Sequence, residues 1–306
     1  MREKVWFSSA GVECAGWHYP GSNGGCVVMT GGFGVTKEPG TDRFAERFAA
    51  AGFSVLAFDY RNFGESGGEP RQVAPIAGQL ADWRAAIGFA ATLPGVERVA
   101  LWSFSLCAGY VVQLAAEDDR IAAAIAQSPN LDGPVVTRKA SRYQSPLGAL
   151  RLAGRAVLDT LGALVGRPPK LVALSGPRGT VALLNTPDAQ LGDAVLNPGN
   201  KYPDWQQTLA ARSILPAVFY RPAKYAADIR CPLLYVVCDD DRSALAAPAI
   251  TAASKSAKAD LVRLPGNHYA PFLESHEAAV EAELTFLRQH LQPHGTPTPP
   301  PLTHST

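Results

Sequence analysis

Short apolar runs alternate with longer segments of helical periodicity through the first part of the chain. Four apolar runs predict strands, at residues 26–29, 53–58, 99–102 and 122–127. Three segments with apolar residues at helical spacing predict helices, at residues 43–51, 76–92 and 106–116. Strands that are apolar on both sides are typical of a parallel sheet covered by helices on both faces. The pattern therefore predicts an α/β fold with a mostly parallel, doubly wound sheet.

The N-terminal residues show a different pattern, in which apolar and polar positions alternate one by one. This alternation extends over residues 5–8 and 12–18. It is typical of strands that are buried on one side only. We expect these two strands to form an antiparallel hairpin at the edge of the sheet.

The α/β rhythm is interrupted in the middle of the chain. Residues 131–226 are rich in Pro, Gly and Arg and show helical patterns only near 147–164 and 205–215. The rhythm then returns with a strand, a helix, a short strand and a final helix, at residues 231–237, 245–256, 260–264 and 272–291. We therefore expect a core formed by residues 1–130 and 227–291. The helical cap, residues 131–226, would be inserted over the cleft where open α/β sheets bind ligands.

Composition narrows the class of protein. The chain has 306 residues, 47% of them hydrophobic, and a formal net charge of +1, which provides no general attraction to nucleic acid or to a membrane. No apolar run approaches the roughly 20 residues of a membrane span, and the N-terminus does not resemble a signal peptide. We expect a cytoplasmic protein. Residues 292–306 are rich in Pro and Thr and predict a disordered tail.

The cysteines agree with a reducing compartment. Their number is odd, and no pair has C-x-x-C spacing. This pattern favours buried, reduced thiols over a disulfide framework or a zinc site. The five residues are Cys14, Cys26, Cys107, Cys231 and Cys238.

Charge is distributed unevenly along the chain. Residues 131–226 contain twelve Lys and Arg against five Asp and Glu, a net charge of +7, whereas the rest contains 16 basic and 22 acidic residues, a net charge of −6. A positive cap is either an ordinary solvated surface or a surface that favours an anionic ligand or an acidic partner such as an acyl carrier protein. The oligomeric state is open, with a homodimer as one alternative.

The first candidate for chemistry lies where the predicted strand at 99–102 meets the helix at 106–116. The sequence there is Ser103-Phe-Ser105-Leu-Cys107, a small-x-Ser-x-small pentapeptide. Such a strand-to-helix turn can hold a serine hydroxyl above the end of a sheet, as in a nucleophile elbow. Both glycines of the usual G-x-S-x-G are absent, however, because Ser103 and Cys107 take their places.

A serine nucleophile needs a base, normally histidine, and a carboxylate that orients the base. The predicted strand at 231–237 is followed by Cys238-Asp239-Asp240-Asp241. The next strand, at 260–264, is followed by Pro265-Gly-Asn-His268. Serine, acid and histidine thus occur in the order found in α/β-hydrolases.

These motifs resemble those of the α/β-hydrolase superfamily, in particular its dienelactone-hydrolase-like and X-Pro-peptidase-like esterases and its polyketide-processing acyl hydrolases. Gly31-Gly-Phe-Gly34 is similar to the oxyanion loop of that family, and Phe58-Asp-Tyr-Arg-Asn-Phe-Gly-Glu-Ser-Gly67 to its D-x-R-G-x-G-x-S-x-G turn. Gly266-Asn-His268 matches the terminal G-x-H. The resemblance covers about residues 3–291 and implies the α/β-hydrolase fold.

The resemblance also implies residue roles. Ser105 would be the nucleophile, His268 the general base and Asp241 the orienting acid, although Asp239 and Asp240 stay open as alternatives. The backbone N–H groups of Phe33 and Leu106 would form the oxyanion hole.

The chain departs from the family pattern in the oxyanion loop. Gly31 stands where the family often has a histidine whose ring braces this loop. We therefore expect a more mobile loop here.

Several of these residues also have a plainer interpretation. Ser105 could be an ordinary helix N-cap, Ser103 could be the nucleophile, and Cys107 a reactive thiol. Four further histidines are predicted to be exposed to solvent: His276, His290, His294 and His304. Asp59 and Arg61 are expected to brace a turn. A final group is expected to pack the cap onto the core or to line an acyl pocket: Trp205, Phe219, Tyr220, Tyr225, Leu183 and Leu184.

Taken together, the sequence predicts a serine hydrolase without cofactor or metal that cleaves a small-molecule ester, thioester or lactone through an acyl-Ser105 intermediate. The glycine-rich segment lacks the nucleotide-binding signatures. Two alternatives remain. The same residues could transfer or cyclise the acyl group, or the chain could be a non-catalytic binding member of the fold.

Overall fold

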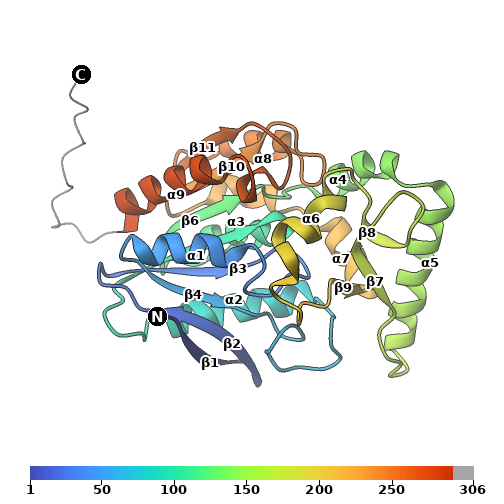
Figure 1. Ribbon diagram of the computed structural model, residues 1–306, viewed down its shortest axis with the longest axis horizontal. Helices are drawn as coiled ribbons and strands as arrows, with labels where there is room; N and C mark the ends of the chain where they lie inside the picture. The colour runs from blue at the N-terminus through green and yellow to red at the C-terminus, as the bar shows by residue number, and fades with distance from the viewer. Residues whose placement is uncertain (292–306) are drawn as a thin grey trace.

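An eight-stranded sheet forms the centre of the computed structural model, which describes residues 1–291 (Figure 1). In order across the sheet the strands are β1 (Glu3–Ser9), β2 (Val12–Tyr19), β4 (Ser54–Phe58), β3 (Gly25–Thr30), β5 (Arg98–Phe104), β6 (Ile121–Gln127), β10 (Leu233–Cys238) and β11 (Ala259–Leu264). The pairings of β1 with β2 and of β2 with β4 are antiparallel, and all others are parallel. Both the mostly parallel sheet and the edge hairpin are thus confirmed.

Helices cover both faces of this sheet, as a doubly wound fold requires. One face is covered by α1 (Thr41–Ala50) and α9 (His276–Leu291), which contact each other. The other is covered by α2 (Ile76–Ala90), α3 (Ala108–Glu117) and α8 (Ala246–Ala253). The central strands β3, β4 and β10 are buried at every position, which explains their continuous apolar runs.

The residues between β6 and β10 form several helices and short strands at one end of the molecule (Figure 1). Their helices are α4 (Gly133–Ala140), α5 (Pro146–Ala163), α6 (Ala189–Leu196) and α7 (Ile214–Phe219). They also include a three-stranded sheet, made of β7 (Leu171–Ser175), β8 (Ala182–Leu184) and β9 (Thr208–Ala210). The division of the chain into a core and a separate cap at residues 131–226 stays a prediction.

Two of the expected helices differ from those observed. The prediction of a helix at 205–215 is wrong. Residues Thr208–Ala210 form strand β9, which pairs with β7, and helix α7 begins only at Ile214. A short apolar run suits a strand or a helix equally well, and only its partner decides between them. The final helix begins at His276 rather than 272, after a separate 3₁₀ turn at Ala270–Phe272 that contains Pro271.

Some side-chain predictions are also tested by the fold. All five cysteines are buried and free, as expected. Phe219 is 71% exposed, so the prediction that it packs the cap onto the core is wrong. His276 is buried, not exposed, because Phe44 of α1 packs against its ring and its Nδ1 lies 2.9 Å from the carbonyl oxygen of Pro271. His294, His304 and the predicted tail at 292–306 lie outside the described residues.

Within residues 1–291, no helix combines the length and the apolar character needed to cross a membrane.

Candidate active site

Ser105 lies at the sharp turn between β5 and α3. Its φ of 61° falls in the left-handed region, which is strained for any residue with a side chain. The preceding Phe104 is extended and the following residues form a 3₁₀ turn that leads into α3. This is the backbone of a nucleophile elbow, and it places the serine at the carboxyl edge of the sheet.

Neither replacement of the usual elbow glycines competes with Ser105. Ser103 is fully buried, and its Oγ lies 2.9 Å from Thr30 Oγ1 and 3.2 Å from the Thr30 carbonyl oxygen, so its hydroxyl joins β5 to β3. Cys107 is also fully buried, and burial raises the pKa of its thiol to about 12. A thiol with this pKa holds its proton at neutral pH and is a poor nucleophile.

His268 contacts both other members of the predicted triad. Its Nε2 lies 3.0 Å from Ser105 Oγ, and its Nδ1 lies 2.7 Å from Asp241 Oδ2. The ring is 1% exposed and packs against Phe104 at a centroid distance of 4.6 Å. The structure therefore brings together side chains that are 27 and 163 positions apart in the chain.

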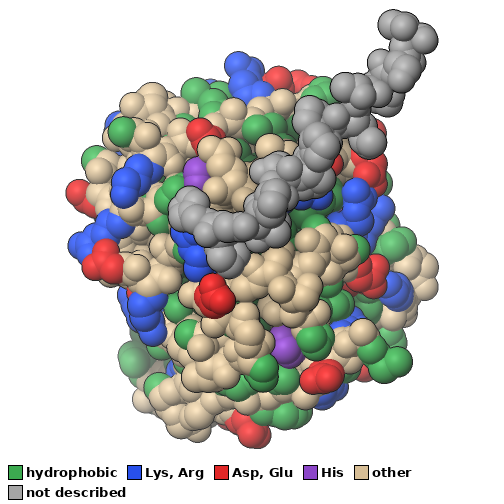
Figure 2. All heavy atoms as spheres, turned by 90° about the vertical axis from the view of Figure 1, so that its left-hand side faces the viewer, with side chains coloured by type: hydrophobic (Ala, Val, Ile, Leu, Met, Phe, Trp, Pro, Cys, Tyr) green, Lys and Arg blue, Asp and Glu red, His purple; other side chains and the backbone are tan. Residues whose placement is uncertain are grey.

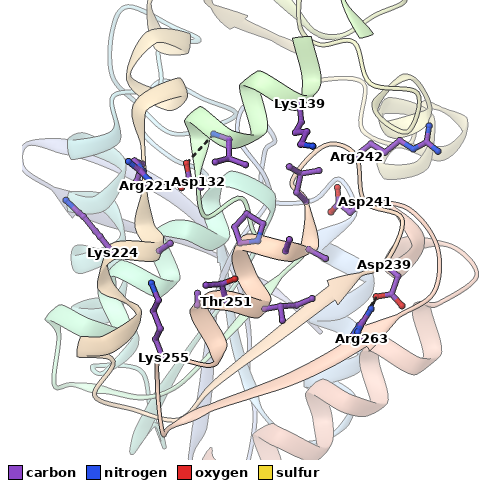
Figure 3. Close-up of a pocket in the computed structure, with 18 of the residues that line it drawn as sticks. Asp132, Lys139, Arg221, Lys224, Asp239, Asp241, Arg242, Thr251, Lys255 and Arg263 are labelled. Carbon is purple, nitrogen blue, oxygen red and sulfur yellow. Dashed lines mark hydrogen bonds and ion pairs between the residues drawn. The ribbon is translucent and has the colours of Figure 1, made fainter. Parts of the chain in front are cut away.

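The three consecutive aspartates after β10 have different surroundings. Asp241 is buried, and its Oδ1 accepts hydrogen bonds from the backbone N–H groups of Ser243 and Ala244. Asp239 instead forms an exposed ion pair with Arg263 at 2.8 Å, drawn as a dashed line in Figure 3. Asp240 is exposed. Of the three, Asp241 alone contacts His268 in the described part of the chain.

Electrostatics around His268 favour its charged form. Burial by itself lowers the pKa of His268, but the charge and hydrogen bond of Asp241 outweigh this effect, and the charge of Asp188 adds to them, so the pKa is raised. An orienting carboxylate that stabilises the imidazolium is what a general base next to serine requires.

Asp188 is a functional candidate that the sequence did not reveal. It is buried at the start of α6, where its Oδ1 accepts a hydrogen bond from the Ser243 hydroxyl at 2.8 Å and its Oδ2 one from the Arg242 N–H at 3.0 Å. Burial raises the pKa of Asp188, yet the nearby His268 and these hydrogen bonds lower it below the usual value. A residue of the segment between β6 and β10, called the inserted segment below, thus holds the loop that carries Asp241. No local motif marks it.

The predicted oxyanion loop has a brace that also went unpredicted. The Trp205 Nε1–H donates a hydrogen bond to the Gly34 carbonyl oxygen at 2.9 Å, and the loop closes with a Val35 N–H to Gly32 carbonyl bond. A Cβ at Gly31 would lie about 3.0 Å from Val35 and from the Thr36 carbonyl oxygen, so a side chain there would require these neighbours to shift. An indole from the inserted segment thus holds the loop where no histidine does, and the expected mobility of the loop stays a prediction.

A cavity of about 320 Å³ opens beside Ser105. Ser105, Phe33 and Leu106 line it from the sheet side. The inserted segment supplies most of the remaining wall, which is largely aliphatic: Val136, Leu152, Ala153, Ala156, Leu174, Leu183, Leu184, Leu196, Ile214 and Leu215. Of the two roles predicted for Leu183 and Leu184, packing the cap onto the core or lining a pocket, the structure shows that they line a pocket. A cavity of this size and character suits an apolar group of a small molecule.

Asp59 and Arg61 brace the turn after β4, as predicted. Asp59 is buried and accepts hydrogen bonds from Lys37 Nζ at 2.7 Å and the Glu65 N–H at 3.0 Å. Arg61 pairs with the buried Asp82 at 2.7 Å. Asp59 thus connects the turn to Lys37, Arg61 connects it to α2, and neither residue lines the cavity.

A second groove, of about 1020 Å³, lies on the other side of α4 (Figure 3). Basic side chains border it: Lys139, Arg142, Arg221, Lys224, Arg242, Lys255 and Arg263. Arg221 pairs with Asp132 and Arg263 with Asp239 in this groove, so its charge does not test the acyl carrier protein or other acidic partner predicted for the positive cap. Both that partner and the homodimer stay predictions.

The chain belongs to the α/β hydrolase family. The family model described as "Alpha/beta hydrolase family" matches residues 27–283. The chain is 36% identical over 292 residues to the quorum-quenching protein AidA of Acinetobacter baumannii, an alignment that covers 93% of this chain and 94% of AidA. It is 31% identical over 183 residues to a thiohydrolase of Eupenicillium brefeldianum, covering 58% of this chain and 56% of that protein.

Solved structures agree on the fold. The α/β hydrolase GrgF from Penicillium sp. sh18 superposes with a TM-score of 0.78 at 21% identity, covering 95% of this chain and 99% of GrgF. The α/β-hydrolase fold and the family resemblance are therefore confirmed, and the protein is an enzyme of the hydrolase class.

Proposed function

We propose that this protein is a serine hydrolase that cleaves an ester, thioester or lactone through an acyl-Ser105 intermediate. The observation that carries the proposal is the pair of contacts at His268, 3.0 Å to Ser105 Oγ and 2.7 Å to Asp241 Oδ2. They match the distances that proton transfer from a serine to an oriented histidine requires.

In the first half of the reaction, Ser105 Oγ attacks the carbonyl carbon of the substrate while His268 Nε2 takes the hydroxyl proton. Asp241 accepts the Nδ1–H of the resulting imidazolium. The negative oxygen of the tetrahedral intermediate would be bound by the backbone N–H groups of Phe33 and Leu106. Leu106 lies in the first turn of a helix, where N–H groups lack an intrahelical partner.

In the second half, the intermediate collapses and His268 donates its proton to the departing alcohol or thiol. A water molecule then loses a proton to His268 and attacks the acyl-Ser105 carbonyl, which releases the carboxylic acid and restores the serine. The aliphatic cavity beside Ser105 would hold the acyl chain during both steps.

The same intermediate can react with an alcohol, an amine or a hydroxyl of the acyl chain itself in place of water. Transfer and cyclisation would therefore use the same three residues and differ in how far water is excluded. Analysis of the products by mass spectrometry in the presence of an added alcohol distinguishes transfer from hydrolysis.

The proposal is tested with Ser105→Ala and, as a matched control, Ser103→Ala. We expect Ser105→Ala to lower the kcat for a p-nitrophenyl ester by about 10³-fold or more and to abolish labelling by a fluorophosphonate probe. Ser103→Ala, which removes a buried hydroxyl two positions away, should still be labelled. Full labelling of folded Ser105→Ala would overturn the proposal. A native chain that binds acyl ligands but resists the probe would indicate a non-catalytic member of the fold.

A further inference from the structure

One side of α5 exposes a cluster of large aliphatic side chains to solvent. These Leu and Val side chains are 47% to 80% exposed, although side chains of this type are normally buried in the core. We define the α5 outer face as Leu147, Leu150, Val157, Leu158, Leu161 and Leu164, the last directly after the helix. An exposed apolar cluster of this size marks an interaction surface.

The spacing of these residues places them on one side of the helix. Leu147, Leu150, Val157, Leu161 and Leu164, with Gly154 completing the series, follow each other at intervals of three or four. Residues at such intervals form a continuous stripe along a helix, here about 27 Å long for 18 residues.

The opposite side of α5 is already occupied. Leu152, Ala153 and Ala156 line the cavity beside Ser105. Helix α5 therefore has two apolar sides, one toward the cavity and one toward solvent. It lies at the extreme end of the molecule, away from the central sheet (Figure 1), and its outer side chains are exposed.

The exposed charges of the segment that carries this face are all positive. Residues 133–187 contain eight Lys and Arg but a single carboxylate, Asp159. Asp159 is buried and neutralised by Arg212 at 2.9 Å. Arg151 and Arg155 lie on α5 itself, next to the exposed aliphatic stripe.

The opposite end of the molecule is different. Figure 2 shows acidic and basic side chains interspersed over the surface there. The end that carries α5 thus combines an exposed aliphatic stripe with a segment whose exposed charges are all positive, unlike the face in Figure 2.

We propose that the α5 outer face binds the surface of an anionic lipid bilayer, with its aliphatic side chains inserted between the headgroups and its arginines against the lipid phosphates. An exposed amphipathic helix with Lys and Arg beside a leucine stripe has the composition of an interfacial membrane helix. Binding would place the cavity wall formed by Leu152 and Ala153 next to the bilayer, where amphiphilic acyl compounds concentrate. Only this consequence for substrate delivery rests on the proposed function.

A second copy of the chain fits the same face less well. Two-fold pairing through α5 would bring together two segments that each have eight basic residues and no exposed carboxylate. Such pairing leaves like charges opposed without partners. An anionic surface neutralises them.

The test is co-sedimentation of the full chain with vesicles of phosphatidylglycerol and phosphatidylcholine, and with vesicles of phosphatidylcholine alone. We expect at least tenfold stronger partitioning onto the anionic vesicles, weakened by salt. Leu158→Glu/Leu161→Glu should reduce it at least tenfold. The matched control Leu191→Glu/Leu273→Glu changes two exposed leucines outside the face by the same charge and should bind as the native chain does.

Three results would overturn the proposal: no partitioning onto anionic vesicles, equal partitioning of Leu158→Glu/Leu161→Glu, or a native dimer in light scattering that this variant converts to a monomer. The last result would assign the face to a second copy. Turnover of a short, water-soluble ester reports separately on Ser105, so loss of vesicle binding with unchanged turnover leaves the proposed function intact.

Discussion

The two regions that meet at the cavity contribute different things to it. The sheet region supplies Ser105, His268 and Asp241, each on a turn after a strand that pairs within the central sheet. The segment between β6 and β10 supplies most of the aliphatic wall, and it adds Trp205 and Asp188. Chemistry thus depends on the sheet edge, while the shape of the substrate space depends on the insertion.

Burial differs between the two regions in the same way. Strands β3, β4 and β10 are buried at every residue, whereas α5 buries only Gly148, Ala156 and Asp159 among its 18 residues. A fully buried region tolerates little change, and an exposed region tolerates much. Variants of the sheet edge should therefore affect all substrates alike, and variants of the insertion should affect some substrates more than others.

The largest effect is expected at the sheet edge. Asp241→Asn keeps a side-chain oxygen for the Ser243 and Ala244 N–H groups but loses the carboxylate charge beside His268. We expect a decrease in kcat of about 10³- to 10⁴-fold for short and long p-nitrophenyl esters alike. Asp240→Asn, at the neighbouring exposed position, should stay within about twofold. An equal loss in the two variants would contradict the assignment of the acid.

A smaller and selective effect is expected from the wall of the cavity. Ala153→Phe adds a ring to the cavity side of α5 and should lower kcat/KM for a long-chain ester by about 10- to 100-fold, because lost apolar contacts of a few methylene groups have this magnitude. The acetyl ester should change little. Ala163→Phe, on the same helix but outside the cavity, is the control. Equal losses for acetyl and long-chain esters in Ala153→Phe would show that the insertion does more than shape the substrate space.

Asp188 joins the two regions, so its removal should reveal their coupling. The negative charge of Asp188 raises the pKa of His268, and His268 must be neutral to act as the base. Asp188→Asn should therefore lower that pKa and shift the acidic limb of the pH–kcat/KM profile to lower pH, with a decrease in maximal rate of about tenfold.

The exposed Asp204→Asn, in the same segment, should leave the profile in place. A decrease in rate for Asp188→Asn without a shift of the limb would assign Asp188 a purely structural role.

The smallest effect concerns the core beneath the sheet. Burial raises the pKa of Glu283 well above its usual value, although its hydrogen bond from Trp102 Nε1 acts against the shift. Because the pKa of Glu283 is higher in the folded than in the unfolded protein, its contribution to stability is fully present below the unfolded-state pKa. This contribution is lost as the pH rises through the folded-state pKa.

Glu283→Gln should therefore melt at nearly the native temperature near pH 4.5. It should become the more stable protein above that pH, by up to about 1.4 kcal/mol for each unit of the pKa shift. Thermal melts between pH 5 and pH 8 measure the difference. A gap that does not widen with pH would show that Glu283 does not titrate in this range.

Much of the sheet region could be predicted because its signals are local. Strands buried on both faces must be apolar throughout, and a nucleophile elbow requires small residues around its serine, so both features are visible in a few consecutive residues. The order of Ser105, the aspartates and His268 followed from the strands they succeed. The choice among three adjacent aspartates followed only from the resemblance, since all three succeed the same strand.

The insertion was harder to predict because its elements depend on distant partners. Strand β9 has only three residues and exists through its pairing with β7, and Trp205 holds a loop 171 positions away. Asp188 has no sequence signal at all, because it contacts the loop of Asp241 through Ser243 and the backbone of Arg242. Contacts of this kind leave no periodicity in the chain.

By itself, then, the sequence determined the doubly wound sheet, the elbow at Ser105 and the order of the residues that succeed its strands, because burial and turn geometry constrain neighbouring positions. Tertiary structure alone decided which aspartate reaches His268, what braces the oxyanion loop, and how Asp188 joins the insertion to the site. The physical reason is distance along the chain: hydrogen bonds between residues tens to hundreds of positions apart form only after the sheet has brought them together.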